Sequence, residues 1–185
     1  MPAALTPPLA ADGKFYVFGY GSLIWQPGFA HAAAHPALLR GYHRRFCLRS
    51  TYYRGTPEAP GLVLGLDRGG ACRGVAFQVP AAAAAEVLAY LEERENPGTA
   101  QVYHRRTMAV RLLDRAEVVP AITYVANRAD ASYCRPSPEV AAQAIARGVG
   151  LTGANRDYLL NTVERLRAMG VRDAALDRIA ALLPS

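Results

Sequence analysis

The sequence predicts an α+β fold, in which a curled sheet or a small barrel comes first and most of the helices follow. Short apolar runs separated by Gly and Pro occupy the first half of the chain, and this pattern is typical of strands. Helix start and stop signals gather towards the C-terminus. The 185 residues, 51% hydrophobic and 19% charged, suffice for one packed core. We therefore expect one domain over residues 14–185, preceded by a flexible segment over residues 1–13.

The strand candidates begin close to the N-terminus. Phe15–Tyr20 is almost continuously apolar, as expected of a strand that is buried on both faces. From Tyr42 the chain alternates with the period of a half-exposed strand. Its two faces are Tyr42, Phe46 and Leu48 on one side and His43, Arg45 and Arg49 on the other. The remaining candidates are Leu62–Leu66, Cys72–Val79, Met108–Leu113 and Val118–Val125.

Four helices are expected. The first spans Ala81–Glu95, because Pro80 suits the first helical position, where its missing N–H costs nothing. This helix stops at Asn96–Gly98, where a proline and a glycine follow the asparagine. The other three run from Ser137, an N-cap residue followed by Pro and Glu, to about Gly148, from about Asn155 to Met169, and from Arg172 to Leu183.

The charge of the chain does not predict a nucleic-acid partner. A net charge of +6 is compatible with phosphate binding, but Lys14 is the only lysine and the arginines are spread over the whole chain. This distribution favours a compositional bias towards Arg, with some arginines binding a small anionic ligand. The sequence carries no motif from which an oligomeric state can be read.

The sequence predicts a cytoplasmic protein without a membrane partner. Its start, Met1–Gly13, has neither a basic segment nor an unbroken apolar core, so it does not resemble a secretory signal. The chain also lacks an apolar run of the roughly 20 residues that cross a bilayer.

The cysteines and histidines do not predict a metal site. Cys47, Cys72 and Cys134 are odd in number and widely spaced, which argues against both disulfides and a thiolate cage, so we expect small buried apolar residues. His31 and His35 are four apart and could share a helix face. A proline follows His35 at once and no acidic third ligand is near in the sequence, which favours two surface histidines.

Glu95 breaks two local rules at once. At 100° per residue it shares a narrow stripe with Ala84, Leu88 and Leu91, whereas Glu93 points away. It also ends the helix, where the macrodipole disfavours an anion by about 0.3 to 1 kcal/mol. Such a carboxylate is a candidate for a raised pKa and a catalytic role. The alternatives are a frayed last turn with Glu95 in water, or a pair with Arg94 or another nearby cation.

The end of the first strand, Tyr20–Leu23, offers a row of backbone N–H donors for a carboxylate or an oxyanion. The alternative is a tight turn or bulge with no further role. The glycines do not make a dinucleotide fingerprint, because the third glycine is missing. Ser22 has no evident His–Asp partners, which argues against a serine hydrolase.

At these residues the chain resembles the ChaC-type γ-glutamylcyclotransferases, the glutathione-degrading branch of that family. The resemblance covers roughly Phe15–Leu183. It rests on Phe18–Trp25, Arg44–Phe46 with Ser50–Thr51, Arg54–Gly55, Pro60–Gly61, Gly74–Phe77, Tyr90–Leu91 with Arg94–Glu95, Tyr124 and Asn155–Leu159. One departure is the segment Asn96–Gln101, which lies before Tyr103 where the family passes quickly into the next strand.

The resemblance implies a small mixed β-barrel flanked by helices, with no metal and no organic cofactor. It implies that Glu95 is the catalytic acid/base and that the γ-glutamyl group is held by Tyr20, Gly21, Ser22 and Leu23. The expected reaction is attack of the substrate's α-amine on its own γ-carbonyl, which converts glutathione to 5-oxoproline and Cys-Gly.

Two further residues are candidates for substrate binding. Arg54 is expected to bind the α-carboxylate, with a solvated loop arginine as the alternative. Tyr124 is expected to hydrogen-bond the substrate, although a barrel tyrosine often packs a core with its hydroxyl at the rim. Two other functions stay open: a cyclotransferase for other γ-glutamyl amines or amino acids, and a γ-glutamyl-binding module that has lost catalysis.

Overall fold

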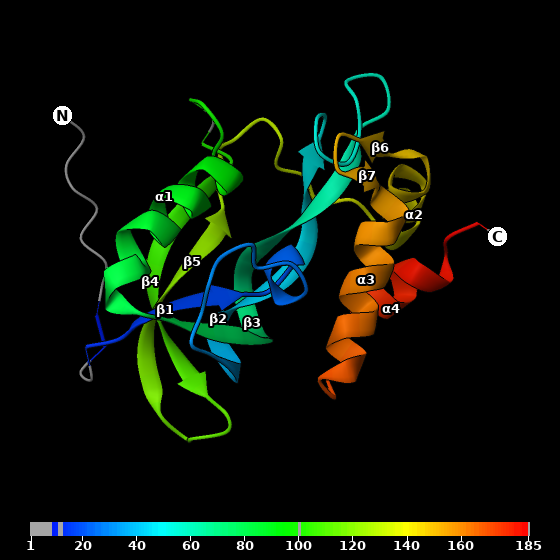
Figure 1. Ribbon diagram of the computed structural model, residues 1–185. Helices are drawn as coiled ribbons and strands as arrows, with labels where there is room; N and C mark the ends of the chain where they lie inside the picture. The colour runs from blue at the N-terminus through cyan, green and yellow to red at the C-terminus, as the bar shows by residue number, and fades with distance from the viewer. Residues whose placement is uncertain (1–8, 11–12, 100, 185) are drawn as a thin grey trace. The chain divides into compact units, whose positions relative to one another are not determined.

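The computed structural model describes residues 9–10, 13–99 and 101–184, which fall into two compact units (Figure 1). The first unit holds the described chain up to His43 together with Arg68–Val125, and the second holds Arg44–Asp67 and the chain from Ala126 onwards. The expected flexible segment lies mostly outside the described residues. The expectation of a single domain stays a prediction.

Five strands close into a barrel in the order β1-β3-β2-β4-β5. β1 pairs antiparallel with β3 through Phe15↔Val79 and parallel with β5 through Val17↔Ile122, so the predicted mixed barrel is confirmed. The bounds are Phe15–Gly19 for β1, Ala33–Ser50 for β2, Gly61–Val79 for β3, Tyr103–Leu112 for β4 and Val118–Ala126 for β5.

The apolar run at the start of the chain is a fully buried strand, as predicted. All five residues of β1 are buried, because neighbouring strands cover both of its edges and its side chains fill the core of the first unit. A buried, paired strand fixes the position of the loop that follows it, and the loop after β1 is the first part of the candidate site.

β2 and β3 are longer than the sequence predicts. The two candidates Leu62–Leu66 and Cys72–Val79 are parts of the single strand β3. Between them Gly69 and Gly70 take positive φ values of 101° and 70°, so these glycines bend the strand locally where the sequence predicts two separate strands. β2 likewise starts at Ala33, ahead of the predicted alternation.

The predicted helix Ala81–Glu95 begins with a 3₁₀ turn, η2 (Ala81–Ala83), and continues as α1 (Ala84–Glu95). Pro80 is the N-cap residue of η2 and not the first helical residue, because its ψ of 137° is extended. α1 ends where predicted, with Asn96 as its C-cap residue. Its buried side chains are Ala84, Val87, Leu88 and Leu91, which confirms the predicted apolar stripe.

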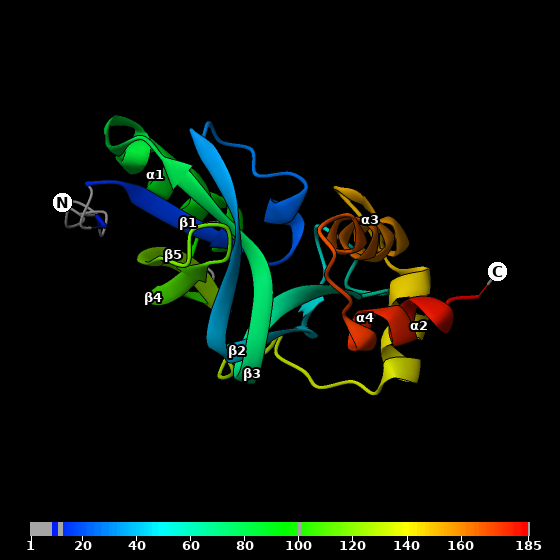
Figure 2. The same ribbon diagram turned by 90° about the horizontal axis from the view of Figure 1, so that it is seen from below.

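Three helices of the second unit pack against one another: α2 (Pro138–Arg147), α3 (Asn155–Ala168) and α4 (Ala174–Ala181) (Figure 2). The predicted N-cap is confirmed, since the hydroxyl of Ser137 accepts a hydrogen bond of 3.3 Å from the N–H of Val140. Between α2 and α3 lie two very short paired strands, β6 (Val149–Gly150) and β7 (Gly153–Ala154). None of the helices in the described ranges has the length and apolarity that spanning a membrane requires.

The three cysteines are free thiols. Cys47 and Cys72 are buried, as predicted, and Cys134 is half-buried. Burial raises the pKa of the Cys47 thiol to about 12 and also raises the pKa of Cys134. The thiols of Cys47 and Cys134 therefore stay protonated at neutral pH.

One of the two histidines is not on the surface. His35 is buried, and its Nδ1 lies 2.7 Å from a carboxylate oxygen of Asp114. The sequence could not indicate this contact, because the two residues are 79 positions apart. His31 is exposed, as predicted, and its ring contacts that of Phe77 with centroids 4.9 Å apart.

Candidate active site

The loop that follows β1 folds back closely on the strand. A Cβ atom on Gly19 would lie 2.9 Å from the Cβ of Leu23 and 3.2 Å from the ring of Phe77, so only glycine permits this approach. The loop continues as the 3₁₀ turn η1 (Ser22–Ile24), closed by a hydrogen bond from the Ile24 N–H to the carbonyl of Gly21 at 3.0 Å.

The first N–H groups of such a turn have no partner inside it. In the parts of the chain that the structure describes, the N–H groups of Gly21, Ser22 and Leu23 have no hydrogen-bond acceptor. They are thus open to a ligand's carboxylate or oxyanion. The predicted row of donors is present in this loop.

Glu95 is the last residue of α1, and its side chain is only 16% exposed. Its pKa is raised from 4.5 to about 7: burial is the largest cause, Arg94 acts in the opposite direction, and the nearby carboxylate of Glu92 adds to the rise. The predicted inward position and raised pKa are confirmed. The alternative of a frayed last turn is wrong, because the helix holds Glu95 away from water.

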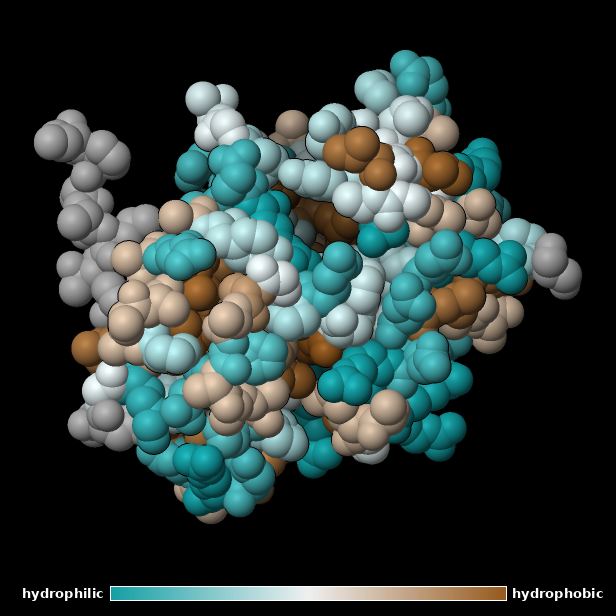
Figure 3. Space-filling view, in the orientation of Figure 1, coloured by the Kyte–Doolittle hydropathy of each residue, from teal (hydrophilic) through white to brown (hydrophobic). Residues whose placement is uncertain are grey.

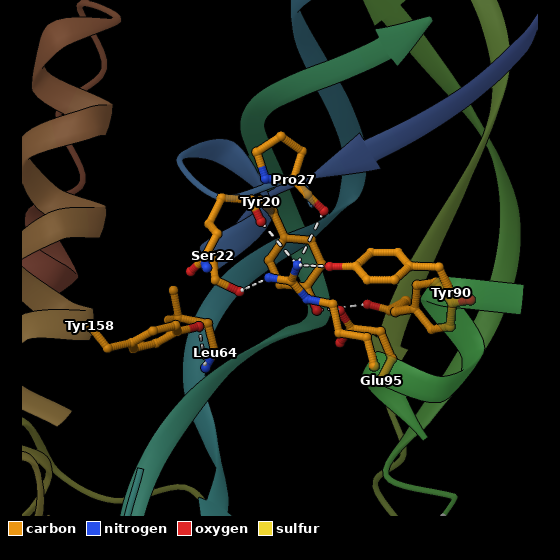
Figure 4. Close-up of polar contacts among 10 residues, drawn as sticks. Tyr20, Ser22, Pro27, Leu64, Tyr90, Glu95 and Tyr158 are labelled. Atoms are coloured by element: carbon orange, nitrogen blue, oxygen red, sulfur yellow. Dashed lines mark hydrogen bonds and ion pairs between the residues drawn. The ribbon is translucent and has the colours of Figure 1, made fainter. Parts of the chain in front are cut away.

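Arg94 contacts both the loop and the end of the helix, where Ser22, Pro27 and Glu95 lie close together (Figure 4). Its Nη1 donates hydrogen bonds to the carbonyls of Gln26–Pro27 at 2.9 and 3.2 Å and to the hydroxyl of Tyr90 at 2.8 Å. Its Nη2 donates to the hydroxyl of Ser22 at 2.9 Å. The Nε of the same group lies 3.6 Å from a carboxylate oxygen of Glu95. One guanidinium therefore contacts both Ser22 and Glu95.

The loop passes so close to α1 that Gly28 allows no side chain. Its φ is +76°, and a Cβ there would overlap the hydroxyl of Tyr90. The guanidinium of Arg94 lies over the ring of Tyr90, 5.9 Å from the ring centre. Gly28, Tyr90 and Arg94 thus form one packed contact.

Tyr124 and Tyr20 meet beside the two glutamates. The hydroxyl of Tyr124 donates to Glu92 at 2.9 Å, and the hydroxyl of Tyr20 donates to the main-chain carbonyl of Tyr124 at 2.8 Å. Arg105 forms an ion pair of 3.0 Å with the same oxygen of Glu92. Burial and the charge of Glu92 raise the pKa of Tyr124, so its hydroxyl keeps its proton.

Arg54 belongs to the second unit. It is buried, and its Nη1 donates to the carbonyls of Thr152 at 2.7 Å and Ala154 at 3.3 Å. The guanidinium lies over the ring of Tyr158, 5.2 Å from its centre, and the hydroxyl of Tyr158 in turn accepts a hydrogen bond from the N–H of Leu64 (Figure 4). The alternative of a solvated loop arginine is therefore wrong, while the role in substrate binding stays a prediction.

Sequence reasoning missed Glu92, Arg105 and the contacts of Arg94. Glu92 precedes Glu95 by three positions, so helical spacing alone could have placed the two carboxylates side by side. Arg105 lies on β4, and nothing in the sequence pairs it with α1. The strand β4 starts at Tyr103, whose N–H donates to the side-chain oxygen of Asn96 at 2.9 Å.

Within the described residues, no group of three or more His, Cys, Asp and Glu side chains is placed to hold a metal ion. The second unit contains a cavity of about 480 Å³ lined in part by three arginines, Arg49, Arg135 and Arg147. None of the predicted site residues lines this cavity. The proposed acid Glu95 and the loop Tyr20–Leu23 lie in the first unit.

The hydropathy of one face of the molecule is shown in Figure 3.

Comparison with known proteins identifies the family. The model of the family described as ChaC-like protein matches residues 15–184. This chain belongs to the ChaC-like family. One relative of this ChaC-like chain is a glutathione-specific γ-glutamylcyclotransferase 1 from Rattus norvegicus, 34% identical over 99% of this chain and 87% of the relative. Another is a glutathione-specific γ-glutamylcyclotransferase from Escherichia coli K12, 33% identical over 90% of this chain and 71% of the relative.

Solved structures share the fold of this ChaC-like protein. A γ-glutamyl cyclotransferase specific to glutathione from yeast superposes with a TM-score of 0.80 at 23% identity, over 92% of this chain and 97% of the other. A second γ-glutamyl cyclotransferase gives a TM-score of 0.54 at 14% identity, over 93% and 89%. The predicted γ-glutamylcyclotransferase-like fold is thereby confirmed.

Proposed function

We propose that this ChaC-like protein is a cytoplasmic, glutathione-specific γ-glutamylcyclotransferase, a carbon–nitrogen lyase. The observation that carries the proposal is the shielded carboxylate of Glu95, with a pKa of about 7, on the same guanidinium as the hydroxyl of Ser22. The glutathione-specific relatives from rat and Escherichia coli support the choice of substrate.

The reaction is an internal transfer. The nitrogen of the substrate's α-amine forms a bond to its own γ-carbonyl carbon, and the bond from that carbon to the cysteinyl nitrogen breaks. The amine loses a proton and the departing nitrogen gains one, so 5-oxoproline and Cys-Gly form without water or an electron acceptor. No metal or organic cofactor is required by this balance.

Glu95 performs both proton transfers in this proposal. A group with a pKa of about 7 exchanges protons readily near neutral pH, and general acid–base catalysis of this kind contributes about 10²- to 10⁴-fold. Freeing an α-amine with a pKa near 8 costs only about 1 to 1.5 kcal/mol at pH 7. Protonation of the departing nitrogen is therefore the more demanding task, because an unprotonated amide nitrogen leaves poorly.

The loop supplies the second contribution. The open N–H groups of Gly21, Ser22 and Leu23 are suited to the negative charge that develops on the γ-carbonyl oxygen, and one such donor is worth about 3 to 4 kcal/mol. Holding the flexible glutamyl chain in its ring-closing shape contributes up to roughly 7 to 11 kcal/mol. We assign the holding of the γ-glutamyl group to Tyr20 and the loop Gly21–Leu23.

Two residues are assigned to the remaining substrate groups. Tyr124 is proposed to hydrogen-bond the substrate, supported by a hydroxyl that keeps its proton beside Glu92. Arg54 is proposed to bind the α-carboxylate. Within the described residues, both side-chain hydrogen bonds of Arg54 are donated by Nη1, which leaves the N–H groups of Nε and Nη2 for the carboxylate.

The test is turnover by the purified protein. The protein is incubated separately with glutathione and with γ-glutamyl-alanine, and 5-oxoproline is detected by mass spectrometry. We expect 5-oxoproline from glutathione. Turnover of γ-glutamyl-alanine alone would assign the same chemistry to other γ-glutamyl compounds, and binding of glutathione without any product would indicate the binding module.

A further inference from the structure

We infer that Arg94 is a positioning residue. Its guanidinium holds the loop Ser22–Gly28 at the end of α1, and so keeps the N–H donors of Gly21–Leu23 oriented towards Glu95. The inference rests on the proposed function, because it assigns a task to a residue of the same site. It goes beyond the proposed reaction in one respect: a third group must hold the N–H donors of Gly21–Leu23 close to the carboxylate of Glu95.

The contacts of Arg94 reach both ends of the loop. Nη2 binds the hydroxyl of Ser22 at its start, and Nη1 binds the carbonyls of Gln26–Pro27 near its end. The planar guanidinium offers its donors in a fixed fork, so it can hold acceptors from both ends of the loop to α1 at once. A lysine ammonium is a single compact point of charge on a flexible stem and lacks this fork.

The same contacts keep Arg94 from neutralising Glu95. Its Nε stays 3.6 Å from the carboxylate, beyond hydrogen-bond distance, because Nη1 and Nη2 are engaged by the loop. A close two-bond pair would hold the pKa of the carboxyl low. At the observed distance burial outweighs the arginine, and the pKa of Glu95 remains near 7. Arg94 thus hydrogen-bonds the loop through Nη1 and Nη2 and makes only a longer contact with Glu95 through Nε.

Tyr90 and Gly28 complete the fastening. The hydroxyl of Tyr90 accepts a hydrogen bond from Nη1, and its ring centre lies 5.9 Å from the guanidinium carbon, so a side chain of α1 also holds the guanidinium. Gly28 leaves the space that the hydroxyl of Tyr90 occupies. The contact is therefore built from both the loop and the helix, and it does not depend on Glu95.

The experiment compares Arg94→Lys with Arg111→Lys. Arg111 is an exposed arginine of β4 in the same unit and controls for the exchange of a guanidinium for an ammonium away from the loop. Two quantities are measured for each protein: kcat and KM for glutathione, and hydrogen–deuterium exchange of the loop. The loop amides of Ile24, Trp25 and Gln26 donate hydrogen bonds within the loop, so their exchange reports whether it is held.

In Arg94→Lys we expect loop exchange at least 10-fold faster and kcat at least 10-fold lower, with a smaller change in KM. Arg111→Lys should match the unchanged protein in both measurements. Loop exchange within twofold of the unchanged protein, or unchanged kcat, would overturn the inference.

The two proposals fail separately. If the unchanged protein turns over no γ-glutamyl compound, the proposed function falls, while the exchange of the loop still decides whether Arg94 holds it. If Arg94→Lys does not fold, Ser22→Ala removes the Nη2 contact alone. Faster exchange of the loop in Ser22→Ala then supports the inference, and unchanged exchange contradicts it.

Discussion

Glu92 lies one helical turn before Glu95 on α1, and its carboxylate raises the pKa of Glu95. Glu92 itself is held by the hydroxyl of Tyr124 and by Arg105. The strands β4 and β5 therefore fix a second negative charge beside the proposed acid/base. This charge helps Glu95 keep its proton near neutral pH.

Replacing Glu92 tests this relationship. In Glu92→Gln the like charge is gone, so the pKa of Glu95 should fall and the rise of kcat/KM with pH should move to lower pH. Glu93→Gln is the matched control, because Glu93 is exposed on the opposite side of α1. A pH profile that moves equally in both variants would show that only the overall charge matters.

Glu95→Gln should lower kcat by more than 100-fold, within the range of general acid–base catalysis. The melting temperature should hold or rise, because an amide removes the cost of a shielded carboxylate. Steady-state kinetics and thermal unfolding measure the two effects. Turnover close to that of the unchanged protein would remove Glu95 from the mechanism.

The raised pKa of Glu95 also predicts how stability depends on pH. Between pH 4.5 and about 7 the folded state keeps a proton that the unfolded state has released, so the free energy of unfolding falls as pH rises. The contribution of Glu95 is fully present below pH 4.5 and lost above about 7, a change of about 3 kcal/mol. Relative to the unchanged protein, Glu95→Gln should therefore gain stability across this window and then level off. Urea unfolding at several pH values measures the difference, and a constant difference would contradict the assignment.

Gly28→Ala should disturb the loop. The positive φ costs an alanine about 1 kcal/mol or more, and the new methyl group must push the hydroxyl of Tyr90 away from Arg94. We expect lower stability and lower kcat. In the background of Tyr90→Phe the steric part of the cost should shrink and the backbone part should remain, which a double-mutant cycle of unfolding free energies resolves.

The sequence predicted features that depend on local spacing. The inward position of Glu95 followed from the helical stripe, and the cap at Ser137 followed from residue type. The contacts that complete the site join distant positions: Arg94 and Ser22 are 72 residues apart and Tyr20 and Tyr124 are 104 apart. Helical and strand periods carry no information on such pairs.

The errors in strand prediction have a physical cause as well. Gly69 and Gly70 usually mark a turn, yet here they bend β3 while it continues. The burial of His35 depends on Asp114, which meets it through the pairing of β2 with β4 near Ala37↔Leu112. Both outcomes are set by tertiary pairing, which overrides local preference.

The protonated thiols of Cys47 and Cys134 affect how readily the protein forms mixed disulfides with glutathione. A protein that binds glutathione also meets its oxidised dimer, and mixed disulfides form by attack of a thiolate. With the pKa of Cys47 near 12 and Cys72 buried, this chain presents little thiolate to such an exchange. Its turnover should accordingly be insensitive to the ratio of reduced to oxidised glutathione, apart from the supply of substrate itself.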